Sequence, residues 1–168
     1  WTHDKSAPKS MQERGKMISE AIKTQWDIVR QVDKRDPPFA TSTLWMEGSH
    51  LHQQGHLDFP DNMMVIFSDN SPGWELQSDF YEVERQPGLE YGVYYHHQLW
   101  GSGPHLVPAV SPQKAHSIFQ QAVQREANTY AILNVGNVRQ YIYSLKAHSE
   151  MLWNFSSFDP DVYTKQWC

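Results

Sequence analysis

Three short apolar runs along the chain each end in polar residues. Met63–Phe67 is followed by Ser68-Asp69-Asn70, Tyr91–His96 ends in aromatic and imidazole side chains, and Tyr130–Leu133 is followed by Asn134. Runs of this length, bounded by turn residues, are typical of buried strands. In α/β barrels and open α/β sheets, ligands bind at the carboxyl ends of such strands. The pattern therefore predicts a ligand site made from the ends of neighbouring strands.

Helical patterns precede and separate these runs. Ser10-Met11-Gln12-Glu13 is a capping-box pattern, which marks the start of a helix that Asp36-Pro37-Pro38 ends. A second helix is expected from about Thr41 to Gln54. Further helices are expected after Ser111-Pro112, after Asn137 with Ile142, Leu145 and Met151 on its core side, from Asp159-Pro160, and as a short segment around Asp79–Glu84 within a long polar loop.

The order of these elements is typical of a parallel sheet, because connections and helices separate the strands. The expected fold class is α/β, a partial (β/α)8 TIM-barrel segment with about three parallel strands and flanking helices. Three strands are too few for a self-standing sheet covered on both faces. We therefore expect residues 1–168 to form a single segment, the middle part of a (β/α)8 catalytic domain in a longer chain.

Composition removes several classes of function. The net charge is -5 and no Lys/Arg cluster is present, so we expect no nucleic-acid partner. No run of 18 apolar residues occurs, so we expect no membrane-spanning segment. A single cysteine excludes a disulfide framework and a cysteine-based zinc site. The 7 Trp, 8 Tyr and 7 Phe residues supply flat apolar faces with polar tips, which suit sugar rings.

Two polar residues at strand ends are candidates for chemistry. Asp69 follows a buried strand, where a rigid backbone could aim its carboxylate and burial could prepare it for general acid catalysis. It could equally cap the turn through Asn70-Ser71-Pro72. Asn134 could place its amide on a sugar hydroxyl or carboxylate, or it could tie neighbouring strand ends together.

The aromatic and histidine residues of the second strand divide between two faces. Side chains alternate along a strand, so Tyr94 and His96 share one face while Tyr95 and His97 share the other. A metal site made from the two adjacent histidines is therefore disfavoured. One histidine could act as a sugar ligand or acid/base group, and a hydrogen-bonded structural histidine is the alternative.

Several short motifs, taken together and in order, resemble glycoside hydrolase family 115. They are Phe59-Pro60-Asp61-Asn62, Phe67-Ser68-Asp69-Asn70, Tyr91–His96, Gly103-Pro104 and Ile132–Gly136. The members of this family are inverting α-glucuronidases that remove glucuronic acid or its 4-O-methyl form from xylan. The resemblance implies a (β/α)8 catalytic domain within a much longer multidomain chain.

The chain departs from the family pattern at acidic positions. The family's Ser-Asp-Asp-Asn becomes Ser68-Asp69-Asn70-Ser71, its Asn-Val-Gly-Asp ends here in Asn137, and its Trp-Glu falls near His116-Ser117. The Asp that follows Tyr-Tyr-His in the family is also replaced, in the stretch His97–Leu99. An inverting glycosidase needs two carboxyl groups. Candidates for the second are Asp79, Glu82, Glu84 and Glu90.

The leading hypothesis is an α-glucuronidase-like hydrolase acting on xylan-type polysaccharide. Asp69 would be the acid/base group, and no metal or organic cofactor would be needed. The sugar would be positioned by Asn134, His96, Tyr95, Tyr94 and Asn70. One alternative is a non-catalytic carbohydrate-binding homologue that has lost a catalytic acid. A further alternative is a metal-dependent hydrolase that uses some of the nine histidines.

The expected partner is a polysaccharide or oligosaccharide, with no nucleic acid and no membrane. A homodimer could form through parts of the chain outside this segment. Although the sequence leaves the compartment open, we expect a secreted or periplasmic protein.

Overall fold

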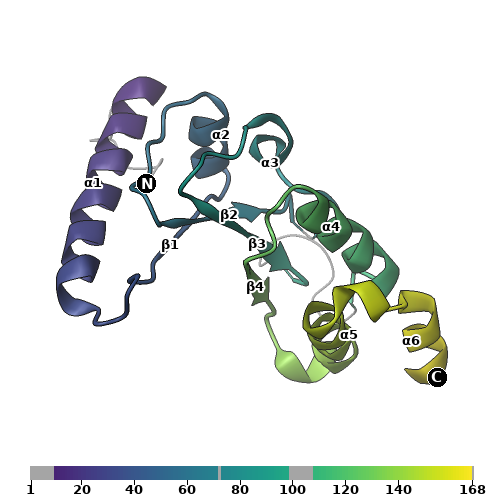
Figure 1. Cartoon of the computed structure of the whole chain (residues 1–168). Helices are drawn as coiled ribbons and strands as arrows, with labels where there is room; N and C mark the ends of the chain where they lie inside the picture. Colours follow the sequence, from purple (N-terminus) through teal and green to yellow (C-terminus); the bar gives the residue numbers. More distant parts are fainter. Residues whose placement is uncertain (1–9, 72, 99–107, 168) are drawn as a thin grey trace. The chain divides into compact units, whose positions relative to one another are not determined.

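The computed structural model describes residues 10–71, 73–98 and 108–167 (Figure 1). Pro72, Leu99 and the Gly103-Pro104 motif therefore lie outside the described residues. The chain divides into two compact units, and each is described by itself. Unit 1 comprises residues 1–68 and 77–92, and unit 2 comprises residues 69–76 and 93–168.

The strands form one four-stranded sheet, in which their order follows the order of the chain, β1-β2-β3-β4. The strands are parallel, and helices separate them along the chain. Such an alternation is that of a (β/α)8 barrel segment, so the expected fold class is confirmed. The strands are β1 Thr41–Thr43, β2 Met64–Ser68, β3 Glu90–His96 and β4 Tyr130–Asn134.

The sequence prediction was wrong at strand β1. It placed residues from Thr41 onward in a helix and recognised three strands. Thr41 pairs with Met64 in a parallel register, and the N–H of Leu44 donates to the carbonyl of Ile66 at 2.8 Å. Threonine is favoured in strands, but three residues are too few to show a period of two. Helix α2 begins later, at Glu47, and ends at Gln53.

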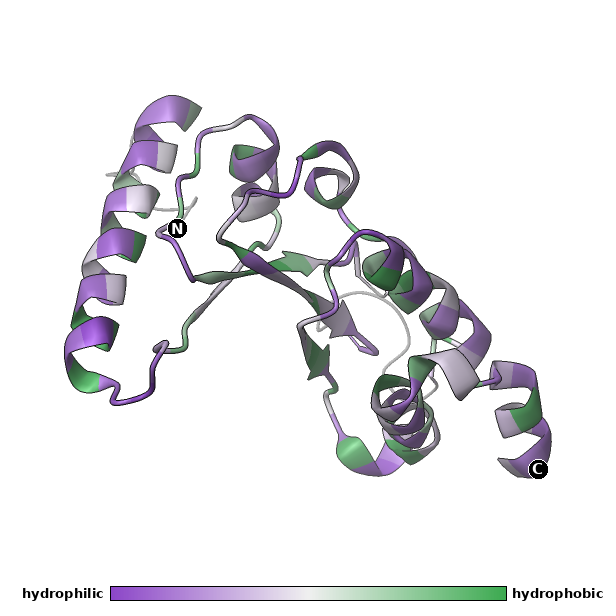
Figure 2. Ribbon diagram, in the orientation of Figure 1, coloured by the Kyte–Doolittle hydropathy of each residue, from purple (hydrophilic) through white to green (hydrophobic). Residues whose placement is uncertain are grey.

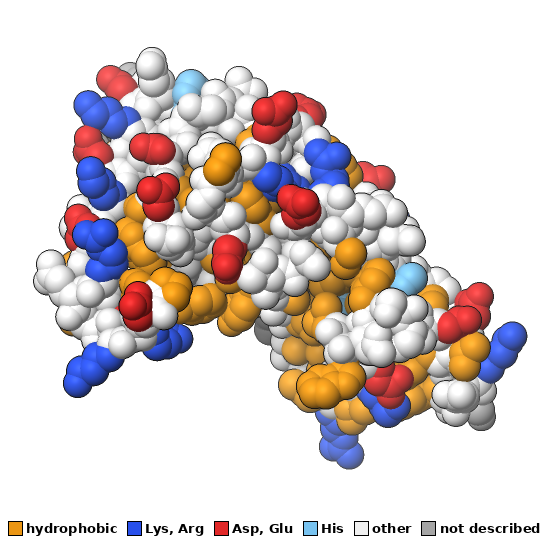
Figure 3. All heavy atoms as spheres, in the orientation of Figure 1, with side chains coloured by type: hydrophobic (Ala, Val, Ile, Leu, Met, Phe, Trp, Pro, Cys, Tyr) orange, Lys and Arg blue, Asp and Glu red, His pale blue; other side chains and the backbone are white. Residues whose placement is uncertain are grey.

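Helix α1, Met11–Val32, begins where the capping pattern predicts. The Ser10 hydroxyl accepts from the Glu13 N–H at 3.2 Å and donates to the Glu13 carboxylate at 2.8 Å. The helix ends before the predicted proline stop, with Asp33 as its C-cap. Hydrophilic residues cover much of α1, and acidic and basic side chains follow one another along it (Figures 2 and 3).

In the core of unit 1, aromatic rings pack around the side chain of one arginine. Phe67 stacks on Tyr91 and meets Phe80 edge to face, with ring centroids 5.5 Å apart in both pairs. The Arg85 guanidinium lies 4.3 Å from the centre of the Phe67 ring. Helix α3, Ser78–Glu82, contributes Phe80 and confirms the short helix expected in this stretch.

Unit 2 contains the remaining helices, and their starts follow the predicted caps. Ser111 accepts from the Lys114 N–H ahead of α4, with Pro112 in its first turn, and Asn137 accepts from the Arg139 N–H. The helical elements are α4 Pro112–Gln124, η1 Val138–Tyr141, α5 Ile142–Trp153, η2 Phe155–Ser157 and α6 Pro160–Trp167.

The predicted core side of α5 needs one correction. Ile142 is 51% exposed, whereas Tyr141 before it is fully buried. Met151 is buried as predicted and Leu145 is half-buried, while the other buried residues of α5 are Ser144, Ala147 and His148. None of the described helices is long and apolar enough to cross a membrane.

Candidate functional site

The Asp69 carboxylate is fully buried at the carboxyl end of β2 and is surrounded by N–H groups. Its Oδ2 accepts from the His96 backbone N–H at 2.6 Å, and its Oδ1 accepts from the Ser71 N–H at 3.0 Å. Oδ1 also lies 2.7 Å from His96 Nδ1. The contact with Ser71 confirms the predicted turn-capping, and the two contacts with His96 bind the turn to β3.

The contact with Asp69 determines the proton position on His96. A carboxylate accepts, so Nδ1 carries the proton and donates to Asp69 Oδ1. The basic nitrogen of the ring is then Nε2. A carboxylate that holds a histidine in one tautomer and orientation is a recurrent device in acid/base chemistry. The pair is well covered, because His96 is 1% exposed.

Tyr94 and Asn134 continue this chain of contacts from His96 to β4. The rings of Tyr94 and His96 have centroids 4.4 Å apart, as expected for two residues on one face of a strand. The Asn134 amide donates to the Tyr94 hydroxyl, and both residues are half-buried. The structure therefore brings Asp69, His96, Tyr94 and Asn134 together within unit 2, and we call these four residues the strand-end chain.

Asn70 is placed in the turn that follows Asp69. Its side-chain oxygen accepts from the Glu75 N–H at 3.1 Å, and its own N–H donates to the Glu75 carbonyl at 2.7 Å. These contacts close the loop of residues 70–76. The loop contains Trp74, which is 53% exposed and which sequence reasoning did not single out. The sequence signal that could have identified Trp74 is an aromatic residue a few positions after the end of a predicted strand.

Tyr95 lies on the opposite face of β3 from the strand-end chain. Its ring is fully buried against Phe119 and His148, and burial raises the pKa of its hydroxyl. The protonated hydroxyl donates to the Gly73 carbonyl at 2.8 Å. Gly73 has φ +84 and leaves no room for a Cβ, which would lie 2.5 Å from the His96 carbonyl oxygen. Tyr95 thus ties the loop to β3, and sugar contact by Tyr95 stays a prediction.

His97 forms a second buried pair on the same face as Tyr95. Its Nε2 lies 3.0 Å from Nδ1 of His148, so His97, the residue after β3, faces helix α5. Burial lowers the pKa of His97 to about 4 and that of His148 to about 3. Both rings are therefore neutral at pH 7, and one donates to the other. No signal in the sequence pairs these two residues.

The four candidates for a second carboxyl group all lie in unit 1. Asp79 is fully buried there, where it accepts from Ser49 Oγ and contacts His52 Nδ1 at 3.2 Å. Glu82 accepts from the Gln53 amide at 2.6 Å. Glu84 and Glu90 are exposed. None of the contacts described for these residues involves Asp69.

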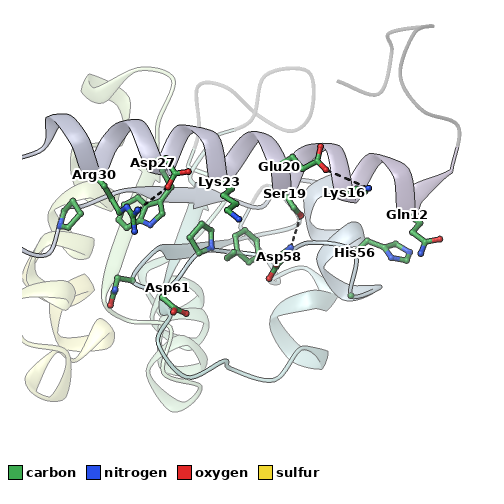
Figure 4. Close-up of a pocket in the computed structure, with 16 residues that line it drawn as sticks. Gln12, Lys16, Ser19, Glu20, Lys23, Asp27, Arg30, His56, Asp58 and Asp61 are labelled. Atoms are coloured by element: carbon green, nitrogen blue, oxygen red, sulfur yellow. Dashed lines mark hydrogen bonds and ion pairs between the residues drawn. The ribbon is translucent and has the colours of Figure 1, made fainter.

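Neither of two hollows formed by described residues is lined by a member of the strand-end chain. One, of about 900 Å³, runs beside α1 and is lined on its other side by residues from the stretch 55–62 (Figure 4). Because residues 55–62 precede β2, this hollow lies toward the amino end of that strand. The other, of about 570 Å³, lies among α5, η2 and α6. Within the described part of the chain, no group of three or more His, Cys, Asp or Glu side chains is placed to hold a metal ion.

Fold and strand-end chemistry define a protein of the parallel α/β barrel class with polar groups at the carboxyl ends of its strands. The chain belongs to glycosyl hydrolase family 115, whose family model matches residues 2–168. The resemblance stated from the motifs is thereby confirmed, and the chain is a homologue of α-glucuronidase-related glycoside hydrolases.

A solved structure supports the fold. It is described as a novel family GH115 4-O-methyl-alpha-glucuronidase, BtGH115A, with specificity for decorated arabinogalactans. Its TM-score with this chain is 0.80 at 21% identity. The match covers 98% of this chain and 23% of that one, so the present chain spans less than a quarter of its length. No curated protein matches the chain.

Proposed function

We propose that this chain carries part of the catalytic domain of a glycoside hydrolase that removes glucuronic acid or 4-O-methylglucuronic acid side chains from xylan-type polysaccharide with inversion. The observation that supports this proposal is the strand-end chain, in which four polar residues from β2, β3 and β4 are joined at the edge where barrels bind ligands. A polymeric substrate also suits a secreted or periplasmic protein.

Asp69 is proposed to serve the acid/base step through His96. Three N–H groups donate to its carboxylate. Asp69 therefore acts as the acceptor that orients His96, and the proton moves at His96 Nε2. The carboxylate also compensates the charge that His96 gains when it takes up a proton.

Tyr94 and Asn134 are proposed to contact the sugar, because they are the half-buried members of the strand-end chain. Besides the donor that binds Tyr94, the amide of Asn134 has an acceptor and a second donor that suit a sugar hydroxyl or carboxylate. Trp74, exposed in the loop after Asp69, offers a flat face for a pyranose ring. Asn70, whose side chain closes that loop, is proposed to support the site through the loop.

A second candidate function is a non-catalytic carbohydrate-binding homologue. The burial of Asp69 and His96 favours it, as does the engagement of Asp79 in another unit. In this case the Asp69–His96 pair would only support the sugar-binding residues, and Tyr94 and Asn134 would hold a sugar without turnover. A homodimer stays a prediction in either case.

The full-length protein, assayed on glucuronoxylan and on decorated arabinogalactan, separates these functions. Released uronic acid supports the hydrolase, and NMR of the first product shows whether the anomer is inverted. Sugar binding without release supports the binding homologue. Asp69→Asn should abolish release, whereas Asp58→Asn, an exposed acidic residue in unit 1, is the matched control and should leave it unchanged.

A further inference from the structure

A hollow of about 570 Å³ lies among the last helices of unit 2 and is bordered by a strongly exposed tryptophan. Trp153, the last residue of α5, is 91% exposed. The chain turns away after it through Asn154 into η2, and α6 closes the other side with Val162. In Figure 3, apolar side chains gather in the part of the surface where Figure 1 shows α5 and α6.

The lining of this hollow combines flat apolar surface with amide and hydroxyl groups. Trp153, Phe158 and Tyr163 supply rings, while Asn154 and Gln166 supply side-chain amides. A hollow of this size is within the range of small-molecule sites, about 300–1,000 Å³. Sugar rings have an apolar C–H face and a rim of hydroxyl groups, so they match an aromatic face beside amides.

The charges around the hollow favour neutral sugars over acidic ones. Its charged lining residues are Glu150 and Asp159, and no lysine or arginine lines it. The N–H groups of Val162 and Asp161 donate to Asp159 and lower the pKa of its carboxyl, so it stays ionised. Glu150 is paired with Lys146, and the positive charge of Lys165 also acts on Asp159, but neither lysine lines the hollow. A uronate would meet like charge here, whereas a neutral pentose or hexose would not.

We propose that this hollow, with Trp153 as its platform, is a second saccharide-binding site that takes neutral sugars of the polysaccharide backbone. The inference rests on the proposed function in one respect, that the protein works on a polysaccharide. The lining residues all fall between Ser149 and Gln166, so none belongs to the strand-end chain. A second contact on one polymer raises the effective concentration of the chain at the first site.

The test uses the full-length protein and measures its binding to unsubstituted xylohexaose, to glucuronoxylan and to free glucuronic acid by calorimetry and affinity electrophoresis. Trp153→Ala should weaken binding of xylohexaose about tenfold, the equivalent of one good contact. Trp153→Tyr should restore most of that binding, because it keeps a flat ring. Leu152→Ala is the matched control, since Leu152 is the exposed neighbour of Trp153 and does not line the hollow.

Activity gives a second readout. On glucuronoxylan, Trp153→Ala should raise KM and leave kcat unchanged, and on a short aldouronic oligosaccharide both should stay the same. The proposal is overturned if Trp153→Ala binds xylohexaose like the wild type. It is also overturned if Trp153→Ala leaves the acrylamide quenching of tryptophan fluorescence in the full-length protein unchanged, because the residue is then covered, or if binding at the hollow requires a uronate.

The two proposals fail separately. Loss of xylohexaose binding in Trp153→Ala, in a protein that releases no uronic acid, would support this site and reject the hydrolase. Release of uronic acid with unchanged binding in Trp153→Ala would support the hydrolase and reject this site.

Discussion

The two units each contain a buried aspartate that contacts a histidine, but the surroundings of the two pairs differ. In unit 1, Asp79 on α3 contacts His52 and accepts from Ser49, both on α2, and His52 lies against Phe59 and Phe67. In unit 2, Asp69 contacts His96, and the contacts continue to half-buried Tyr94. The first pair is packed against aromatic rings, whereas the second is in contact with a side chain that is partly exposed.

Residue type alone does not separate these pairs. Serine, aspartate and histidine meet at Asp79, yet the aspartate lies between the other two. A nucleophilic triad needs the histidine in the middle, because it must take the hydroxyl proton. The unit 1 pair therefore joins two helices, while the unit 2 pair lies where strand ends deliver polar groups.

The strongest test of this difference replaces each aspartate in the full-length protein. Asp69→Ala should lower kcat on glucuronoxylan about a hundred- to ten-thousand-fold, the usual contribution of acid/base help, with modest loss of sugar binding. Asp79→Ala should leave kcat of the folded protein near normal and destabilise it by several kcal/mol, because it leaves buried Ser49 and His52 without their partner. Asp69→Ala also leaves buried N–H groups without an acceptor, so kcat, and not stability, separates the two variants. Steady-state kinetics and urea unfolding measure the two effects. Near-normal turnover in Asp69→Ala would remove it from the reaction.

Replacing the histidine of each pair tests which pair takes part in proton transfer. His96→Gln should lower kcat about a hundredfold, since a glutamine cannot carry the proton. His52→Gln should keep kcat and lower only the melting temperature. Equal kcat in the wild type and His96→Gln would contradict the proposed route of the proton.

The pair His97–His148 contains no carboxylate, and it predicts a loss of stability in acid. The lowered pKa values mean that the unfolded chain binds protons below about pH 6.5, whereas the folded protein resists protonation until about pH 4 at His97 and about pH 3 at His148. The stabilisation is complete above pH 6.5 and is lost as the pH falls, by up to about 1.4 kcal/mol per pH unit for each histidine.

Urea unfolding of the full-length protein between pH 7 and pH 4 measures this slope. His148→Gln should flatten it, because one buried histidine is gone. His50→Gln, which changes an exposed histidine of α2, is the control and should leave the slope unchanged.

The smallest expected effect concerns the outer part of the strand-end chain. Tyr94→Phe removes the hydroxyl that accepts from Asn134 but keeps the ring against His96. We expect KM for glucuronoxylan to rise about threefold to tenfold, as for one hydrogen bond, with little change in stability. The matched change in unit 1, Tyr91→Phe, should affect stability alone, because the Tyr91 hydroxyl accepts from the Gln86 N–H.

The sequence by itself determined the elements whose signals are local. The apolar runs predicted β2, β3 and β4, and the capping residues Ser10, Ser111 and Asn137 marked helix starts, because each signal acts within a few residues. The alternation of Tyr94 and His96 against Tyr95 and His97 likewise follows from strand geometry alone.

Only the tertiary structure decided which polar groups meet. Asp69 and His96 are 27 residues apart, and His97 and His148 are 51 apart, so no local pattern pairs them. Strand β1 also depended on its neighbour, since three residues become a strand by pairing with β2. The physical reason is the same in each case: a buried hydrogen-bonding group takes the partner that the fold brings to it, and local propensity does not encode that partner.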